Sequence, residues 1–216
     1  MPARQSPPSS RSRVRRLPAQ ASYERADIHA IVDAAHVCHV AFADDHGVHC
    51  IPTACWRGGD ALFIHGSRGS RMLGALLKGG PACVTITHLD GLVLARSAFN
   101  HTMNYRSAVV HGTFELVADE DKAQVLDLLV DHIAPGRRPA IRGANAKELK
   151  ATDVLRLSLA DASAKIRRGG PKDDDEDLAL RVWAGELPFA QARRPALVAE
   201  GCAPGMPGEP LWWVPA

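Results

Sequence analysis

The first apolar pattern along the chain is typical of a helix, and the next three are typical of strands. Ile28, Ile31 and Val32 are spaced i, i+3, i+4 and predict an amphipathic helix that begins near Arg25. Runs that mix apolar and polar residues then follow, separated by turn residues such as Asp, His and Gly. These runs predict strands at 37–43, 48–57 and 61–65.

The remaining pattern adds helices between further strands. Ser70 is a natural N-cap for a helix over 69–78, and two further helices are predicted over 119–133 and 145–150. The predicted strands are 82–88, 92–96, 105–117 and 154–166, with a hairpin turn at Leu89-Asp90-Gly91. Because strands do not alternate regularly with helices, a parallel doubly wound sheet is disfavoured. The pattern favours a mainly β (α+β) fold, an antiparallel closed or split barrel with flanking helices.

The two ends of the chain differ in composition from its middle. Residues 1–22 are rich in Pro, Ser and Arg, which predicts a disordered basic tail. Residues 191–216 are rich in Pro and Gly, which predicts an irregular C-terminal extension. Since 216 residues suit one domain, we expect a single folded domain at 23–190.

Composition narrows the possible partners. The formal net charge is +2 and aromatic residues make up 5%, so we expect neither a nucleic-acid nor a membrane surface. Five cysteines without CxxC spacing, and histidines without metal-ligand spacing, predict neither disulfides nor a metal site. No apolar run reaches about 18 residues, and the basic N-terminus has no apolar stretch after it. We therefore expect a cytoplasmic protein.

One segment is typical of a phosphate-binding turn. In 63–71 a strand ends, a Gly/Ser turn follows and a helix begins. Free backbone N–H groups at such a helix start attract anions, and Ser67, Ser70, Arg68 and Arg71 would add hydroxyls and positive charge. An ordinary capped helix start with solvated arginines is an equally good interpretation of this segment alone.

A second segment, 100–107, is rich in side chains that form hydrogen bonds. Arg106 and Ser107 are adjacent, so they should face opposite sides of a strand. By itself the segment is typical of a polar barrel rim.

Taken together, these segments resemble the pyridoxamine-5′-phosphate-oxidase-like FMN-binding split barrels, in their nitroimidazole-resistance-type branch. The resemblance is carried by the strings FIHGSRGSRM, VTITHLDGLVLARSAFNHTMNYRSAVVHG and VWAGELP, and it covers about 25–188. It implies a six-stranded antiparallel split β-barrel that forms a homodimer with FMN at the subunit interface.

The resemblance also implies a set of cofactor-binding residues. Ser70 and Arg71 match the pair that holds the FMN phosphate, and Met72 replaces a lysine, so Arg68 or Arg57 would have to supply that charge. The other matched positions are Ile51, Pro52, Thr53 and Ala54 along the flavin ring, His65, Gly66 and Ser67 beside it, Arg106 and Ser107 on a neighbouring strand, and the late Trp183. His65 is the candidate proton donor.

One departure from the family concerns the substrate. Pyridoxamine phosphate oxidases follow the WxG tripeptide with an Arg-Leu-His-Asp-Arg stretch, whereas Glu186-Leu187-Pro188-Phe189 follows here. Vitamin B6 oxidation is therefore not expected. We expect a flavin-dependent oxidoreductase that takes electrons from a nicotinamide nucleotide and reduces a small acceptor, such as a nitroaromatic compound.

Two other functions stay open at this point. One is a flavin carrier or sensor without turnover, or a relative that uses deazaflavin. The other is a haem-binding split barrel, with His65, His101 or His111 as a candidate axial ligand.

Overall fold

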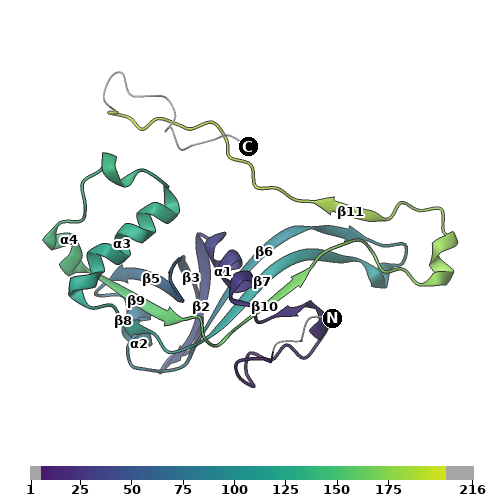
Figure 1. Ribbon diagram of the computed structural model, residues 1–216, viewed down its shortest axis with the longest axis horizontal. Helices are drawn as coiled ribbons and strands as arrows, with labels where there is room; N and C mark the ends of the chain where they lie inside the picture. The colour runs from purple at the N-terminus through teal and green to yellow at the C-terminus, as the bar shows by residue number, and fades with distance from the viewer. Residues whose placement is uncertain (1–5, 203–216) are drawn as a thin grey trace.

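A computed structural model describes residues 6–202, which form two antiparallel sheets with helices around them (Figure 1). The larger sheet has the strand order β1-β10-β7-β6-β2-β3, with β11 added to β6, and the smaller has the order β4-β5-β9-β8. The strands are β1 (Ala21–Ser22), β2 (Val37–Asp44), β3 (Gly47–Ala54), β4 (Trp56–Gly58), β5 (Ala61–Ser67), β6 (Ala82–Leu94), β7 (Thr102–Gly112), β8 (Glu115–Leu116), β9 (Thr152–Ser158), β10 (Ala162–Arg167) and β11 (Gly185–Pro188). The helices are α1 (Arg25–Asp33), α2 (Arg71–Leu76), α3 (Asp119–Ile133) and α4 (Ala146–Ala151), with short 3₁₀ turns η1 (Pro18–Gln20), η2 (Ala98–Asn100), η3 (Arg138–Ala140) and η4 (Asp175–Ala179).

The chain passes between the two sheets at four points. It leaves the larger sheet between β3 and β4, at Cys55, and again between β7 and β8, and it returns between β5 and β6 and, in residues 159–161, between β9 and β10. The predicted strands 48–57, 105–117 and 154–166 are therefore each split, because their two parts belong to different sheets. The predicted class, a mainly antiparallel split barrel with flanking helices, is confirmed.

The main core lies between the two sheets and α1. Alternation along β2 turns Cys38, Val40 and Phe42 inward, as the sequence pattern predicts. Ile28, Ile31 and Val32 form the buried stripe of α1. Ser70 caps α2, as predicted, with its hydroxyl oxygen accepting the Leu73 N–H, so Leu73 and Leu76 enter the same core.

A second, smaller core lies between the four-stranded sheet and α3. Trp56, Phe63, Val117 and Val154 are buried there, and Val125, Leu126 and Leu129 of α3 pack against them. The apolar stripe predicted for 119–133 is thus confirmed, although its last member, Ile133, is exposed.

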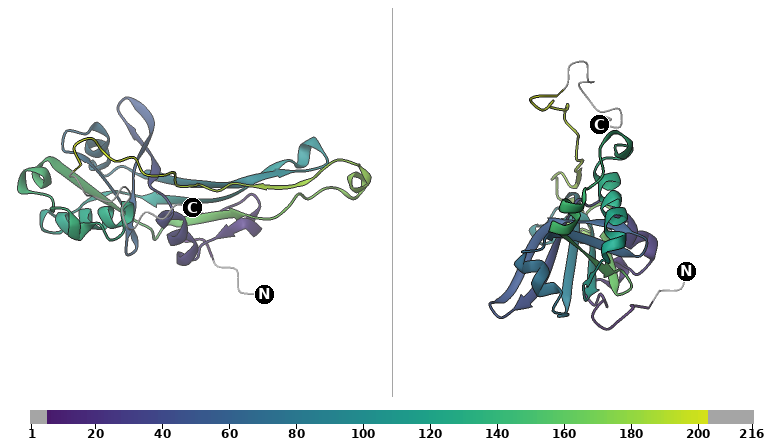
Figure 2. Two further views of the ribbon diagram at one scale, coloured as in Figure 1. Left: turned by 90° about the horizontal axis from the view of Figure 1, so that it is seen from above. Right: turned by 90° about the vertical axis from the view of Figure 1, so that its left-hand side faces the viewer.

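A long arm projects from the barrel (Figures 1 and 2). It consists of the distal halves of β6 and β7 (residues 89–106) and of residues 168–189, whose β11 lies along β6. The predicted hairpin turn at 89–91 is wrong, because β6 is one strand that continues through a register irregularity between Leu89 and Gly91. Partners on both sides hold it straight there: Asp90 pairs with Arg106 of β7, and Gly91 faces β11.

Residues 6–22, for which composition predicts disorder, lie against β10 in the structure. The Ser9 hydroxyl donates to the Asp161 carboxylate at 2.7 Å, Arg11 forms an ion pair with the same carboxylate, and Ser12 is buried. The segment has few apolar residues, and specific polar contacts hold it in place instead. Composition alone does not predict such contacts, which is why it predicts disorder here. The rest of the predicted tail, residues 1–5, lies outside the described residues.

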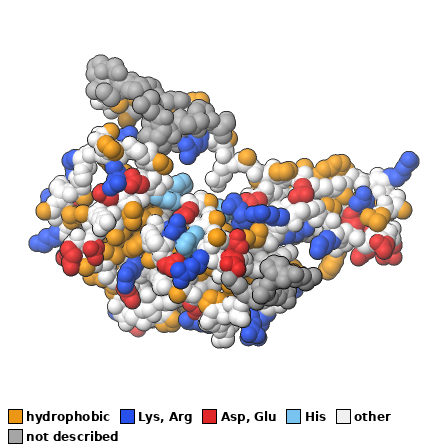
Figure 3. Space-filling model, in the orientation of Figure 1, with side chains coloured by type: hydrophobic (Ala, Val, Ile, Leu, Met, Phe, Trp, Pro, Cys, Tyr) orange, Lys and Arg blue, Asp and Glu red, His pale blue; other side chains and the backbone are white. Residues whose placement is uncertain are grey.

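Beyond β11 the chain has no regular element up to residue 202, and it runs back from the arm toward the α3 side of the barrel (Figure 1). Residues 203–216 of the predicted C-terminal extension lie outside the described residues. Figure 3 shows hydrophobic side chains along the edge of the arm.

Candidate cofactor site

The predicted phosphate-binding turn lies where β5 passes into α2. The Ser70 N–H donates to the Ser67 carbonyl at 2.8 Å, and the Ser67 hydroxyl oxygen accepts the Gly69 N–H at 3.3 Å. The Ser70 oxygen likewise accepts the Leu73 N–H. Both hydroxyls use an oxygen lone pair inside the turn, so each keeps its own hydrogen free to donate to a ligand.

The arginines at this turn are not equivalent. The Arg68 guanidinium donates to Asp153 at 3.2 Å. Arg57, the other candidate to replace the missing lysine, donates through two nitrogens to Asp33 at 2.8 and 2.7 Å. Arg71 is exposed and has no ion pair within residues 6–202, so it is the cation of the turn that is free to meet an anion.

Gly66 and Met72 have packing roles at the same turn. A Cβ on Gly66 would lie 3.1 Å from the Leu73 Cδ1 atom, so glycine lets α2 approach the end of β5. Met72 packs against the main core. The position matched to a phosphate-binding lysine therefore contributes an apolar contact here.

The predicted ring-binding strand, 51–54, lies in β3, at the edge of the larger sheet. Ile51 packs against the main core, and alternation places Thr53 on its side of the sheet and Pro52 and Ala54 on the other. An edge strand has backbone groups along one side that no neighbouring strand uses. This geometry suits a planar ligand bound by main-chain atoms, and β3 contacts β5 at the same end of the barrel.

His65 lies near the end of β5 and packs against Trp56 of the second core. The two rings meet edge to face, with centroids 5.7 Å apart. The His65 Nδ1 atom is buried without a hydrogen-bond partner. Burial lowers the pKa of His65 below its usual value, so the imidazole is mainly neutral at pH 7. A neutral imidazole is a good metal ligand or base, and it is a weaker proton donor than the sequence interpretation assumed.

Arg106 and Ser107 face opposite sides of β7, as predicted, and both are engaged. Arg106 donates through two nitrogens to Asp90, each at 2.9 Å. This pairing raises the pKa of Arg106 and lowers that of Asp90. The Ser107 hydroxyl donates to the Lys165 carbonyl at 3.3 Å. Within one chain neither residue contacts the 65–72 turn.

Trp183 lies in the arm, between η4 and β11, and 62% of it is exposed. It packs against Gly185, where a Cβ would lie 3.1 Å from the indole ring. Gly185 pairs with Leu94 at the distal end of β6, whereas α2 follows β5 of the other sheet. The structure thus gathers residues 65–72 beside β3 and leaves Trp183 apart from them.

The sequence interpretation missed a polar pair at the tip of the β2–β3 hairpin. The His49 Nε2 atom lies 2.7 Å from the Asp44 Oδ1 atom, which also accepts the His46 N–H at 2.8 Å. These hydrogen bonds lower the pKa of Asp44, and the positive charge of Arg71 adds to the effect. The hairpin pattern itself carried the signal, because closing a turn at residues 44–47 brings residue 49 beside residue 44.

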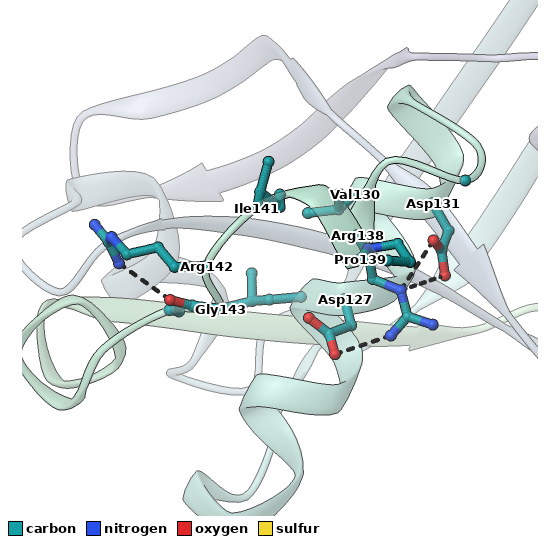
Figure 4. Close-up of a pocket in the computed structure, with 11 residues that line it drawn as sticks. Asp127, Val130, Asp131, Arg138, Pro139, Ile141, Arg142 and Gly143 are labelled. Carbon is teal, nitrogen blue, oxygen red and sulfur yellow. Dashed lines mark hydrogen bonds and ion pairs between the residues drawn. The ribbon is translucent and has the colours of Figure 1, made fainter. Parts of the chain in front are cut away.

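A separate pocket of about 550 Å³ lies between α3 and the loop that follows it (Figure 4). Its central charge is already neutralised: Arg138 donates to Asp127 and Asp131, each at 2.9 Å. Arg142 pairs with Glu148 of α4 and lowers the pKa of that carboxyl to about 2. None of the residues predicted for cofactor binding lines this pocket.

Two further classes of site were sought within residues 6–202. No group of three or more His, Cys, Asp or Glu side chains is placed to hold a metal ion by itself. None of the helices in this range has the length and apolar character that a bilayer-spanning segment needs.

Comparison with known proteins defines the class. The family model described as pyridoxamine 5′-phosphate oxidase matches residues 24–166, and the chain belongs to this family. No curated protein sequence matches the chain.

Solved structures give a finer comparison. The chain is similar to the flavocytochrome Anf3 from Azotobacter vinelandii, with 38% identity, 96% of each chain covered and a TM-score of 0.90. It is also similar to an FAD and heme binding protein from Mycobacterium smegmatis, with 41% identity, 87% of this chain and 93% of the other covered, and a TM-score of 0.84. A protein named for 5-nitroimidazole antibiotic resistance, from Bacteroides thetaiotaomicron, shares the fold at 19% identity and a TM-score of 0.57, with 68% and 86% of the two chains covered.

Proposed function

We propose that this chain is a redox protein that binds a flavin and a haem and transfers electrons between a donor and a small acceptor. The observation that carries the proposal is the similarity over 96% of the chain, at 38% identity, to a protein named as a flavocytochrome. The second relative, at 41% identity, is named for binding FAD and haem. At this level of identity, the names of the two relatives support the same two cofactors for this chain. The residues of the site can then be compared with what each cofactor needs.

The flavin fits the turn at the start of α2. Arg71 offers an unpaired guanidinium, and Ser67 and Ser70 offer hydroxyl hydrogens, so the turn would hold a flavin phosphate. The main-chain edge of β3 would lie along the ring system. The sequence resemblance implied FMN. We propose FAD instead, because the Mycobacterium smegmatis relative is named for it, and the same turn serves the phosphate nearest the ring in either cofactor.

For the haem, His65 is the best of the three candidate histidines. Burial lowers the pKa of its imidazole, and neither of its ring nitrogens has a hydrogen-bond partner within residues 6–202. His101 is exposed in the arm, with its Nδ1 atom 2.8 Å from the Ser97 carbonyl. We propose that His65 would hold the haem iron, since a neutral imidazole with a free ring nitrogen is the form that binds iron.

When bound, the flavin would take up an electron pair from a reduced donor and the haem would carry single electrons. The protein supplies binding and position for both groups. We retain a nicotinamide nucleotide as the donor and a small oxidised molecule as the acceptor.

The direct test is the absorption spectrum of the purified protein, followed by mass identification of the released chromophores. We expect flavin absorption together with a Soret band, and FAD as the extracted flavin. A flavin spectrum without a Soret band would reject the haem, and extracted FMN would reject FAD. A colourless protein that takes up neither group would reject the proposal as a whole.

A pair of variants tests the haem ligand. His65→Gln should remove or strongly shift the Soret band while flavin content persists, because the ring nitrogen is lost and Ser67, Ser70 and Arg71, which would hold the flavin phosphate, are unchanged. His101→Gln is the matched control, and its spectrum should equal that of the wild type. An unchanged Soret band in His65→Gln, or the same loss in both variants, would reject His65 as the ligand.

We also propose that the protein works as a homodimer with the flavin at the subunit interface. The arm exposes large apolar side chains that a single copy does not cover: Phe99 (95% exposed), Trp183, Leu187 and Phe189. Contiguous exposed apolar surface of this kind marks interaction sites. Light scattering should show a dimer for the wild type and more monomer for Phe99→Ser/Leu187→Ser. A wild-type monomer with full flavin occupancy would reject the dimer.

A further inference from the structure

A second basic concavity lies at the base of the arm, away from the 65–72 turn. It is a groove of about 510 Å³ between η1 and the loop that follows β10. Its floor is Ile166, and its walls are Gln20 and residues 167–172. None of the residues that line the groove is acidic, whereas Arg168 and Lys172 bring two positive charges to it.

These two cations differ from several arginines of the barrel and the arm. Arg57, Arg68, Arg96, Arg106 and Arg156 each form an ion pair with a carboxylate. Arg168 and Lys172 are exposed and have no ion pair within residues 6–202. The nearest acidic residue along the chain, Asp173, is already paired with Arg96 at 2.6 Å. The charge of Arg168 also helps to lower the pKa of Asp90, but that carboxylate is paired with Arg106, so no ion pair within residues 6–202 occupies either cation of the groove.

The loop that carries these cations is held from its other side. Arg167, the last residue of β10, donates to the Gly169 and Gly170 carbonyls at 2.8 and 3.0 Å. It also donates to Asn104, whose amide in turn donates to Glu186 of β11. Gly169 has a φ of +96°, which a residue with a side chain rarely adopts. The loop is thus preorganised, so ligand binding would cost less free energy for ordering the loop.

The groove wall contains an unsatisfied acceptor. The Gln20 Oε1 atom is buried and has no hydrogen-bond partner. A buried acceptor without a donor costs about 1–3 kcal/mol, so a small turn of the amide toward a donor in the groove would be favourable. Cations alone would attract any anion, whereas cations beside an acceptor select an anion that also carries hydroxyl or amino donors.

We propose that this groove binds a nucleotide, with its phosphates on Arg168 and Lys172 and a ribose hydroxyl or amino group on the Gln20 amide oxygen. The ligand class we assign is a nicotinamide dinucleotide. This is a binding site for the dinucleotide, and it does not depend on the electron-donor role in the proposed function. The segment before η1 carries three more exposed arginines, Arg13, Arg15 and Arg16, which would draw a polyphosphate toward the groove.

The test is calorimetric titration of the purified protein with NADP⁺, which binds without transferring electrons. In Arg168→Ser/Lys172→Ser the dissociation constant should rise at least tenfold, because both phosphate contacts are lost. The matched control, Lys147→Ser/Lys150→Ser on α4, removes the same charge from exposed lysines and should change the constant less than twofold. Equal affinity of the wild type and the Arg168→Ser/Lys172→Ser variant for NADP⁺ would overturn the proposal.

A second pair of titrations separates a nucleotide site from a general polyanion surface. Gln20→Leu should weaken NADP⁺ severalfold and leave inorganic pyrophosphate unchanged, because pyrophosphate at neutral pH has no ribose hydroxyl or amino group to donate. If pyrophosphate and heparin bind as tightly as NADP⁺ and lose affinity in parallel across the variants, the groove is an anion surface and the nucleotide site is rejected. The chromophore spectrum is recorded on the same samples, so loss of NADP⁺ binding with flavin and haem intact overturns this site alone.

Discussion

The barrel and the arm are parts of the same seven-stranded sheet, yet they are stabilised differently. In the barrel, β6 and β7 bury Val84, Ile86 and Val110 against α1 and the smaller sheet. In the arm the same two strands are held by polar pairs, Asp90 with Arg106 and Arg96 with Asp173. The free energy of apolar burial depends little on the direction of the contact, whereas a hydrogen-bonded ion pair requires a specific distance and angle between its two groups. Apolar burial therefore dominates in the barrel, whereas polar pairing shapes the arm.

The largest contrast should appear in the free energy of unfolding. Ile64→Ala removes a side chain with no exposed surface from the main core and should cost about 2–5 kcal/mol. Leu187→Ala, on the exposed side of the arm, should cost well under 1 kcal/mol when measured on the monomer at low protein concentration. Urea unfolding of both variants makes the comparison, and a similar loss in the two would show that the arm belongs to the same cooperative core.

The next effect concerns ligand binding in the barrel. Arg71→Ala should weaken a phosphate-bearing flavin roughly ten- to hundredfold, since a charge-assisted hydrogen bond is worth about 1.5–3 kcal/mol. Riboflavin, which has no phosphate, should bind the variant and the wild type equally. Fluorescence quenching titrations measure both ligands, with Lys78→Ala at the other end of α2 as the control. Equal losses for the two flavins would make Arg71 a structural residue.

A glycine tests the arm alone. A Cβ at Gly91 would lie 2.7 Å from the Leu187 carbonyl oxygen, a backbone atom that can move only if β11 moves. Gly91→Ala should therefore detach β11, and the amides of residues 185–187 and of Phe189 should exchange with deuterium at least tenfold faster. The barrel amides of β5 and β9 should keep their protection. Gly80→Ala, where nothing lies within 4 Å of the added Cβ, serves as the control.

The smallest effect should be a selective loosening of the arm in acid. The Arg96 backbone N–H and guanidinium lower the pKa of Asp173, and Arg106 lowers that of Asp90. A carboxyl whose pKa is depressed on folding stabilises the fold above its unfolded pKa, near 3.9, and this contribution is lost as pH falls through the folded value. Below about pH 4 proteolysis should cut the arm before the barrel, and Asp173→Asn should show the same cutting at pH 7. Simultaneous cutting of the arm and the barrel in acid would contradict the conclusion that ion pairs stabilise the arm more than the barrel.

Much of the barrel and part of the site could be predicted from the sequence. Alternation gave β2, a short apolar run between turns gave β5, helical spacing gave α1 and α3, and Ser70 marked the start of α2, because each signal reflects a local rule about which side chains face a core. The strings at 63–72, 84–112 and 182–188 carried the resemblance to the family, and the family model confirms it over residues 24–166, which include the first two strings. The same local rules failed at Leu89-Asp90-Gly91, where turn-forming residues lie inside a continuous strand.

The sequence by itself determined which residues are buried in the barrel and that a Gly/Ser turn with arginines lies at the start of α2. Tertiary structure alone decided which charges remain free: Arg57 and Arg68 are paired with carboxylates 24 and 85 residues away, while Arg71 is not. It also decided that Trp183 lies in the arm and that Arg168 faces Gln20 across a groove. Burial follows from the periodicity of neighbouring residues, but a charge or a groove depends on segments far apart in the chain, and local patterns do not record which distant segments meet.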